Sequence, residues 1–292
     1  MAKSQWSFKT AVELSAALAA KKVSAVELAE DAIARIERHD AKINAICVRD
    51  FERGLAAARI ADAELARGVK KPLLGLPVTV KESYNVAGLP TTWGNPAQKD
   101  FRPTEDALPI SRIKDAGGII LGKTNVPILS HTGTHADDSW AGPTLNVVMP
   151  DRVPGGSSAG TATAVGASMA VLGLAEETGG SIQNPASAQD LVGIKPTIGL
   201  VPNAGVMPLS GNRDVVGPIA RTVKDAALCL DVLAGYSAED PKTLAGVGKK
   251  PVGGYTSKFG LVAMDRATGV RTPKTSYGWF KGVATTGMLP SA

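Results

Sequence analysis

Residues 154–182 of the chain read PGGSSAGTATAVGASMAVLGLAEETGGSI. Two glycine turns, Gly155-Gly156 and Gly179-Gly180, each stand directly before a serine. Between them, the small residues 159–169 predict a helix that can pack close to a sheet, and the apolar run 170–175 predicts a strand. The second turn therefore lies between a strand and a helix start, where unpaired N–H groups point at whatever occupies the turn.

The serines after these turns are candidates for nucleophilic catalysis. A serine is a poor nucleophile unless a base takes its proton, and a glycine turn lets backbone N–H groups crowd around a developing oxyanion. Ser181 is the candidate nucleophile, with an N-cap serine as the structural alternative. Ser157 has a similar alternative, in which its glycine turn only caps the next helix. The segment around Ser157 is neither a Walker A loop, which needs Gly-Lys-Ser/Thr, nor a G-x-S-x-G elbow, because residue 159 is alanine.

Lys81 is the candidate base. It ends the apolar stretch 74–81, which we predict to be a short buried strand. Burial disfavours the charged form of a lysine, so a lysine in this place can act as a neutral base. The alternative is an exposed lysine at the strand end, paired with Glu82.

The three histidines are weaker candidates for catalysis than Lys81 and the two serines. A Ser-His-Asp triad would need one of them, but His39 closes an early helix, where it suits the helix dipole. His131 and His135 are four residues apart, yet no cysteine or further carboxylate–histidine motif joins them. We therefore predict no zinc site there.

The rest of the chain alternates helical and strand patterns, which predicts an α/β fold with one main domain. Ser24 and Glu27 form the sequence signature of a capping box at a helix start. Apolar spacing predicts further helices over residues 10–21, 24–40, 50–68, 106–116, 182–191 and 222–233. Further predictions are a strand over 118–122, a turn or helix start over 125–129, and a long loop without periodicity over 133–153.

The composition indicates a globular protein. The 292 residues are 44% hydrophobic and 20% charged, which suits a sizeable core and excludes disorder over most of the length. The net charge of +5 resides near the C-terminus, where residues from Lys242 onward include eight Lys or Arg and one acidic residue. No aromatic-rich basic stripe accompanies it, so we expect no nucleic-acid partner.

No stretch resembles a signal peptide or a membrane span. Cys47 and Cys229 lie far apart, as expected for buried thiols in a reducing, cytoplasmic compartment.

From Gly75 to Leu233 the chain resembles the amidase signature family of serine hydrolases. The order and spacing of the matching segments are far more specific than any single motif. Ser157 and Ser181 are 24 residues apart, a separation similar to that of the family's two catalytic serines. The matching segments are 75–92 around Lys81, LGKTNVP (121–127), GPTLN (142–146), PGGSSAG (154–160), TGGSI (178–182) and VGIKPT (192–197).

The resemblance implies a fold and a set of roles. The fold is a mixed β-sheet core covered by helices on both sides. Ser181 would be the nucleophile, Ser157 the bridging serine after a cis peptide bond, and Lys81 the terminal base. Neither a metal nor an organic cofactor is implied. Around the triad, the implied oxyanion and substrate-binding residues are Thr178, Gly179 and Gly180, and the implied supporting residues are Gly155, Gly156 and Ser158.

The implied reaction is hydrolysis of a carboxylic amide to an acid and ammonia or an amine, through an acyl-enzyme on Ser181. One alternative is a glutamine-hydrolysing subunit of an aminoacyl-tRNA amidotransferase. Another is a non-enzymatic pseudo-amidase or truncated binding scaffold. The expected partner is a small-molecule amide, with no membrane partner, and with a homodimer as the candidate assembly.

The chain also departs from the family pattern. Glu177 stands where the family usually has aspartate, Gln183 where arginine is frequent, and Ala159 where glycine or serine is common. We expect an amidase domain over 1–236, with N-terminal helices in 8–70 and the catalytic core in 71–236. Residues 237–292 are expected to be a basic, divergent and poorly ordered tail, and the fold to be incomplete at the C-terminus.

Overall fold

The computed structural model describes residues 4–246, 262–264 and 271–273. The chain divides into two compact units, 1–248 and 249–292. In the second unit, β7 (Val262–Met264) and β8 (Arg271–Pro273) form an antiparallel pair. Most of the expected tail lies outside the described residues, so its order and the boundary at 236 stay predictions.

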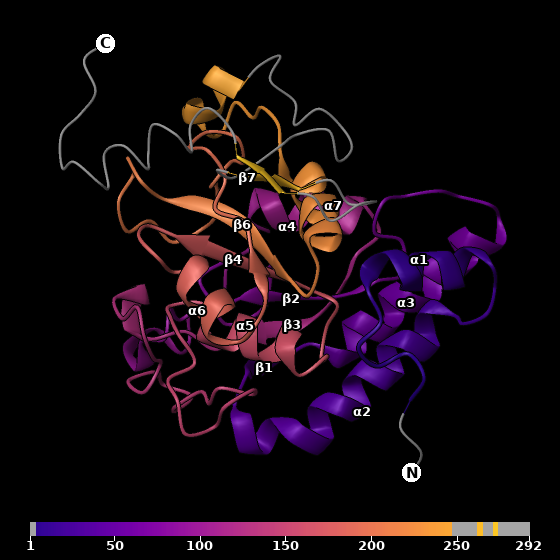
Figure 1. Cartoon of the computed structure of the whole chain (residues 1–292), viewed down its shortest axis with the longest axis horizontal. Coiled ribbons are helices and arrows are strands. Elements are labelled where there is room, and N and C mark those ends of the chain that lie inside the picture. The colour runs from indigo at the N-terminus through magenta and orange to yellow at the C-terminus, as the bar shows by residue number, and fades with distance from the viewer. Residues whose placement is uncertain (1–3, 247–261, 265–270, 274–292) are drawn as a thin grey trace. The chain divides into compact units, whose positions relative to one another are not determined.

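The first unit is built on a six-stranded mixed sheet, which confirms the predicted architecture (Figure 1). The strand order is β1-β3-β2-β4-β6-β5. β2 is parallel to both of its neighbours, β3 and β4, whereas the other pairs are antiparallel. The strands are β1 (Ile46–Arg49), β2 (Pro77–Lys81), β3 (Ile119–Thr124), β4 (Leu172–Glu177), β5 (Val192–Gly193) and β6 (Val215–Ala220).

Helices cover both faces of this sheet (Figure 1). Successive side chains of a strand point to opposite faces, and β4 shows the division. Leu172 and Leu174 belong to the larger apolar cluster, with residues of α1, α2, α3, α4 and α7 and with Ala164 of α5. Ala175 belongs to a smaller cluster with residues of α5 and α6. The helices are α1 (Ala11–Ala19), α2 (Ala25–Ile43), α3 (Phe51–Ala66), α4 (Leu108–Asp115), α5 (Ala159–Gly166), α6 (Gln183–Ala188) and α7 (Val223–Leu233).

Local sequence features explain where α2 begins and how closely α5 packs on the sheet. Ser24 and Glu27 form the predicted capping box at the start of α2. On α5, small residues let the helix approach the sheet as predicted. A Cβ added at Gly173 of β4 would lie 2.5 Å from Cγ2 of Thr161 on α5. The contact between α5 and β4 therefore has no room for a methyl group at this position.

All seven predicted helices are present, with ends shifted by a few residues. The turn predicted near 125–129 is the short 3₁₀ helix η2 (Ile128–Ser130), and 133–153 holds no helix or strand. Two further 3₁₀ helices are η1 (Pro96–Gln98) and η3 (Pro241–Gly246). The sequence did not predict β1, β5 or β6.

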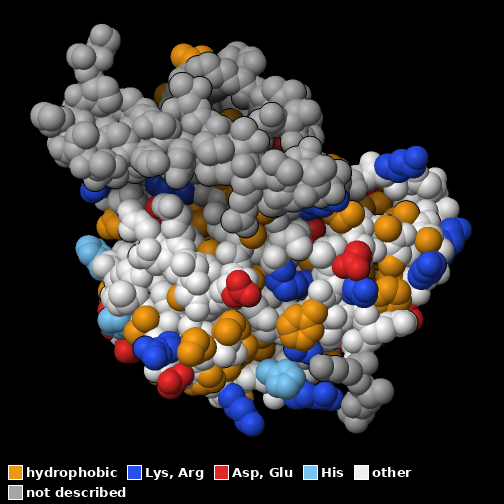
Figure 2. Space-filling view, in the orientation of Figure 1, with side chains coloured by type: hydrophobic (Ala, Val, Ile, Leu, Met, Phe, Trp, Pro, Cys, Tyr) orange, Lys and Arg blue, Asp and Glu red, His pale blue; other side chains and the backbone are white. Residues whose placement is uncertain are grey.

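The surface of the described part mixes charges of both signs. On the face seen in Figure 2, Lys and Arg side chains lie interspersed with Asp, Glu and apolar groups. Within the part of the chain that the structure describes, every helix is too short or too polar to cross a membrane.

Candidate active site

Lys81 lies at the end of β2, in the middle of the sheet, and its side chain is fully buried. Its Nζ atom is 2.6 Å from Oγ of Ser157 and 2.6 Å from Oε1 of Glu176. Burial lowers the pKa of Lys81, and the carboxylates of Glu176 and Glu177 oppose this shift. The prediction of a buried lysine is confirmed, and the alternative of an exposed lysine paired with Glu82 is wrong.

The first glycine turn brings Ser157 to Lys81. The peptide bond between Gly156 and Ser157 is cis, as the resemblance implied, and Gly155 has a φ of +75°. The N–H of Gly156 donates to the carbonyl of Gly133 over 2.9 Å. A Cβ at Gly156 would lie 2.6 Å from the carbonyl oxygen of Thr132, so the turn has room for glycine only.

The second glycine turn holds Ser181 beside the first turn. Ser181 follows β4, precedes α6, and is buried. The N–H of Ser158 donates to the carbonyl of Ser181 over 3.3 Å, so a backbone hydrogen bond joins the two turns. The structure therefore brings the side chains of Lys81 and Ser157 into contact and joins the Ser157 turn to the Ser181 turn through the backbone. Among the described residues, no side-chain hydrogen bond links Ser157 to Ser181.

A family model described as Amidase matches residues 27–267. The chain belongs to the amidase signature family. It spans about half the length of the curated relatives it matches. It is 42% identical over 234 residues to a glutamyl-tRNA(Gln) amidotransferase subunit of Gloeobacter violaceus, a match that covers 80% of this chain and 48% of that protein.

Solved structures of amidase signature enzymes share the fold. Native peptide amidase from Stenotrophomonas maltophilia matches with a TM-score of 0.77 and 32% identity, covering 82% of this chain and 50% of that one. A bacterial aryl acylamidase, described as a member of the amidase signature family, matches with a TM-score of 0.76 and 30% identity. The match covers 82% of this chain and 50% of the acylamidase chain. At these identities the likeness extends beyond the architecture to the family.

Two of the departures from the amidase signature pattern, Glu177 and Gln183, contact each other. The Gln183 amide donates to Oε1 of Glu177 over 2.6 Å. The same carboxylate accepts from the backbone N–H groups of Gly180, Ile182 and Gln183, at 2.7, 2.9 and 3.1 Å. Burial alone would raise the pKa of Glu177, but these hydrogen bonds outweigh it and lower the pKa. Glu177 therefore fixes the turn that carries Ser181.

The N–H groups of this turn are not equivalent. Gly180 has a φ of +93°, and its N–H already donates to Glu177. Within residues 4–246, the N–H groups of Gly179 and Ser181 have no protein acceptor. A Cβ at Gly179 would meet nothing within 4 Å, so there is open space beside it. Thr178 donates its hydroxyl to Oδ1 of Asp214 over 2.5 Å, which secures the start of the turn.

Two residues of this site, Glu176 and Ser130, were not predicted from the sequence. Glu176 contacts the amine of Lys81, and its Oε1 atom also accepts the Ser130 hydroxyl over 2.9 Å. The predicted strand ended at Ala175, which left Glu176 in the turn, whereas β4 continues to Glu177. The sequence feature that could have indicated Glu176 is the pair of consecutive carboxylates, Glu176 and Glu177, at the end of an apolar strand.

The histidine side chains take no part in the hydrogen bonds described for this site. Within the described residues, no histidine hydrogen-bonds to Ser157 or Ser181; His135 contacts the Thr134 hydroxyl at 2.8 Å. No three His, Cys, Asp or Glu side chains of the described ranges gather as a metal-binding group.

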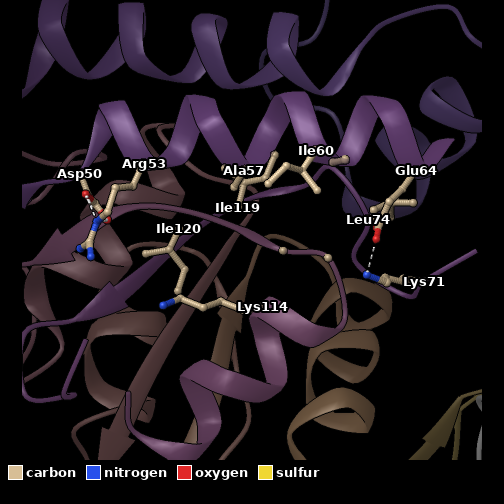
Figure 3. A pocket seen from close by; sticks show the side chains of 13 residues that line it. Asp50, Arg53, Ala57, Ile60, Glu64, Lys71, Leu74, Lys114, Ile119 and Ile120 are labelled. Atoms are coloured by element: carbon tan, nitrogen blue, oxygen red, sulfur yellow. Dashed lines mark hydrogen bonds and ion pairs between the residues drawn. The ribbon is translucent and has the colours of Figure 1, made fainter. Parts of the chain in front are cut away.

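Several cavities open in the described part of the chain, and two of them are lined by residues of β3 or β4. One, of about 280 Å³, runs along α3 and the start of β3 (Figure 3). Four of its charged residues pair with one another, Arg53 with Asp50 and Lys71 with Glu64, and the fifth, Lys114, pairs with Asp106. None of the candidate catalytic residues lines this cavity. The other, of about 210 Å³, has Glu176 in its wall and so reaches the partner of Lys81.

Proposed function

We propose that this chain hydrolyses a carboxylic amide to an acid and ammonia or an amine, with Ser181 as the nucleophile. The observation that carries the proposal is the buried Nζ of Lys81, 2.6 Å from Oγ of Ser157. The backbone hydrogen bond from Ser158 to Ser181 supports it, because it holds the bridging serine's turn against that of the nucleophile. A lysine with a lowered pKa suits the role of the base.

The proposed reaction begins with neutral Lys81. Lys81 takes the proton of Ser157, Ser157 takes that of Ser181, and Oγ of Ser181 attacks the amide carbonyl. The free N–H groups of Gly179 and Ser181 hold the oxyanion, while Gly180 sets the shape of the turn through Glu177. The relay then returns a proton to the leaving nitrogen, and water cleaves the acyl-enzyme.

Covalent labelling tests this proposal directly. A fluorophosphonate probe should label the wild-type protein, and Ser181→Ala should abolish the labelling because the attacking oxygen is gone. His131→Ala is the control and should label like the wild type, since no role in the relay is assigned to His131. Labelling that survives Ser181→Ala would remove Ser181 as the nucleophile.

A second candidate is a glutamine-hydrolysing subunit of an aminoacyl-tRNA amidotransferase. The 42% identity to the glutamyl-tRNA(Gln) amidotransferase subunit of Gloeobacter violaceus favours it. Such a subunit works with partner chains, so glutamine hydrolysis that depends on a co-purifying partner would support it. Hydrolysis of simple amides by the isolated chain, without glutamine hydrolysis, would oppose it.

The remaining alternative is a binding scaffold without activity. A folded protein that no fluorophosphonate probe labels would favour it over both enzymes. For the location we propose the cytoplasm, because Cys47 and Cys229 are both free thiols. A homodimer stays a proposal that sedimentation of the purified chain would test.

A further inference from the structure

Glu176 occupies an unusual place for a carboxylate. It lies on β4 with only 5% of its surface exposed. Its Oε1 atom is 2.6 Å from Nζ of Lys81 and also accepts the hydroxyl of Ser130. A buried carboxylate is costly unless it is paired and hydrogen-bonded, and here the ion-pair partner is the proposed catalytic base.

The other charged and titratable groups around Lys81 form their hydrogen bonds or ion pairs with other partners. The Glu177 carboxylate holds the turn before Ser181. The Tyr84 hydroxyl donates to the carbonyl of Ala175 over 2.6 Å. Glu82, next to Lys81 in the chain, faces Lys123, with 3.7 Å between Oε1 and Nζ. Within the described residues, Glu176 is therefore the carboxylate that forms an ion pair with Lys81.

The proposed relay needs such a group. When Ser181 forms its bond to the carbonyl carbon, its O–H bond breaks and the proton passes to Oγ of Ser157. The proton of Ser157 passes to Nζ of Lys81, which becomes an ammonium ion in a buried place. A carboxylate 2.6 Å away stabilises that ammonium ion, and no proton needs to move to the carboxylate. The ammonium ion later gives up its proton, through Ser157, to the leaving nitrogen.

We propose that Glu176 is a positioning residue of this relay: its carboxylate holds the Lys81 amine against Ser157 and stabilises the ammonium ion that forms there. This inference rests on the proposed function, since it assigns Glu176 a task only if Lys81 is the base. Its part resembles that of the carboxylate beside the histidine in a Ser-His-Asp triad, which orients the base and stabilises its protonated form.

The ion pair has a consequence for pH. A negative charge next to a lysine favours the protonated, inactive form of the base, so Glu176 raises the pH at which Lys81 becomes neutral. Removal of the charge should therefore shift the activity profile to lower pH. It should also lower the maximal rate at high pH, because the ammonium ion formed during the reaction then lacks its partner.

The test measures the rate of fluorophosphonate labelling of Ser181 from pH 5 to 10. Glu176→Gln keeps the shape and a hydrogen-bond acceptor but removes the charge. We expect the pH of half-maximal rate to fall by about 1 to 3 pH units relative to the wild type, with a lower plateau. Glu82→Gln is the matched control, because Glu82 is an equally buried carboxylate paired with a different lysine. Its half-maximal pH should equal that of the wild type.

The possible results separate the two proposals. A Glu176→Gln profile with an unchanged or raised half-maximal pH would show that Glu176 is only structural. Labelling that persists in Ser181→Ala would instead refute the proposed function. If Glu176→Gln fails to fold, Glu176→Ser replaces it, and the same fall in half-maximal pH is expected. Ser130→Ala gives a test that does not alter Glu176 itself. It keeps the Glu176 carboxylate and removes a hydroxyl that competes with Lys81 for Oε1, so it should raise the half-maximal pH. A lowered value would contradict the proposal.

Discussion

At the scale of single residues, the described part of the fold contains two buried lysine–glutamate pairs on neighbouring strands. Lys81 of β2 pairs with Glu176, and Lys123 of β3 pairs with Glu82. The second pair organises structure: Glu82 accepts the N–H groups of Thr92 and Trp93, and Lys123 donates to the Thr91 hydroxyl. The first pair contacts a serine hydroxyl in addition. The same chemical pair thus has one structural and one proposed catalytic use.

Lys123 gives a prediction about stability and pH. Burial lowers its pKa to about 8, against the opposing effects of Glu82 and Cys47. Between about pH 8 and the ordinary lysine pKa of about 10.4, the unfolded chain binds more protons than the folded one, so folding gains stability as pH rises. In Lys123→Met this gain is absent. The stability advantage of the wild type over the variant should therefore increase with pH, by up to about 1.4 kcal/mol per pH unit.

Urea unfolding of both proteins at pH 7.5 and 9.5 measures this difference. Because all other groups are shared, their titration largely cancels in the comparison. A wild-type advantage that is constant or falls over this interval would show that Lys123 keeps its ordinary pKa in the fold.

The sequence pointed to Lys81, Ser157 and Ser181 as candidates because order and spacing along the chain carry that information. It did not identify Glu176, whose partner lies 95 residues away in the chain, on a neighbouring strand. Which side chain of one strand faces which side chain of the next depends on register, and no local pattern fixes it. The same reason explains why Glu82 was the alternative partner predicted for Lys81, since Glu82 is its neighbour in sequence and not in space.

At the scale of elements, the packing of α5 on β4 gives the next prediction. A methyl group at Gly173 would lie 2.5 Å from Cγ2 of Thr161 and 3.0 Å from Cγ2 of Val165. Gly173→Ala should therefore destabilise the fold by about 1–3 kcal/mol, the usual cost of overpacking a core. Thr161→Ser removes the contacting methyl group and keeps the hydroxyl that faces Thr124.

The double variant Gly173→Ala/Thr161→Ser should recover part of the lost stability. Urea unfolding of the four proteins gives the coupling free energy of the pair. Simple additivity of the two substitutions would mean that the helix moves away from the strand, and the close packing would then not be the constraint we infer.

Elements with a local signature were predictable, and elements without one were not. Capping residues and apolar spacing placed the long helices, as Ser24 and Glu27 did for α2. β6 is buried over its whole length and contains Gly217 and Pro218, which ordinarily speak against a strand. β5 is two residues long. These strands exist because β4 and β6 pair across the sheet, a tertiary effect that no short window of sequence contains.

At the scale of the whole molecule, one stretch of sequence holds two of the three catalytic candidates, Ser157 and Ser181, whereas Lys81 comes from a separate strand, β2. Residues 154–182 supply both glycine turns, the helix α5 between them, and strand β4. The cooperativity of the first unit is a property that no single stretch provides. It can be measured at Cys229, which is fully buried on α7 within the larger apolar cluster.

Cys229 should report global opening of the first unit. Burial raises the pKa of its thiol to about 12, so both access and ionisation require the surrounding core to open. In a Cys47→Ser background, where Cys229 is the remaining cysteine of the chain, reaction with a disulfide reagent at pH 8 should be at least about 100-fold slower in buffer than in urea. Addition of Gly173→Ala, which lies in β4 and not in α7, should accelerate the reaction in buffer by about tenfold for each 1.4 kcal/mol of lost stability. An unaltered rate in that variant would mean that α7 opens alone, and that the helix is then a separate unit of unfolding rather than part of the cooperative core.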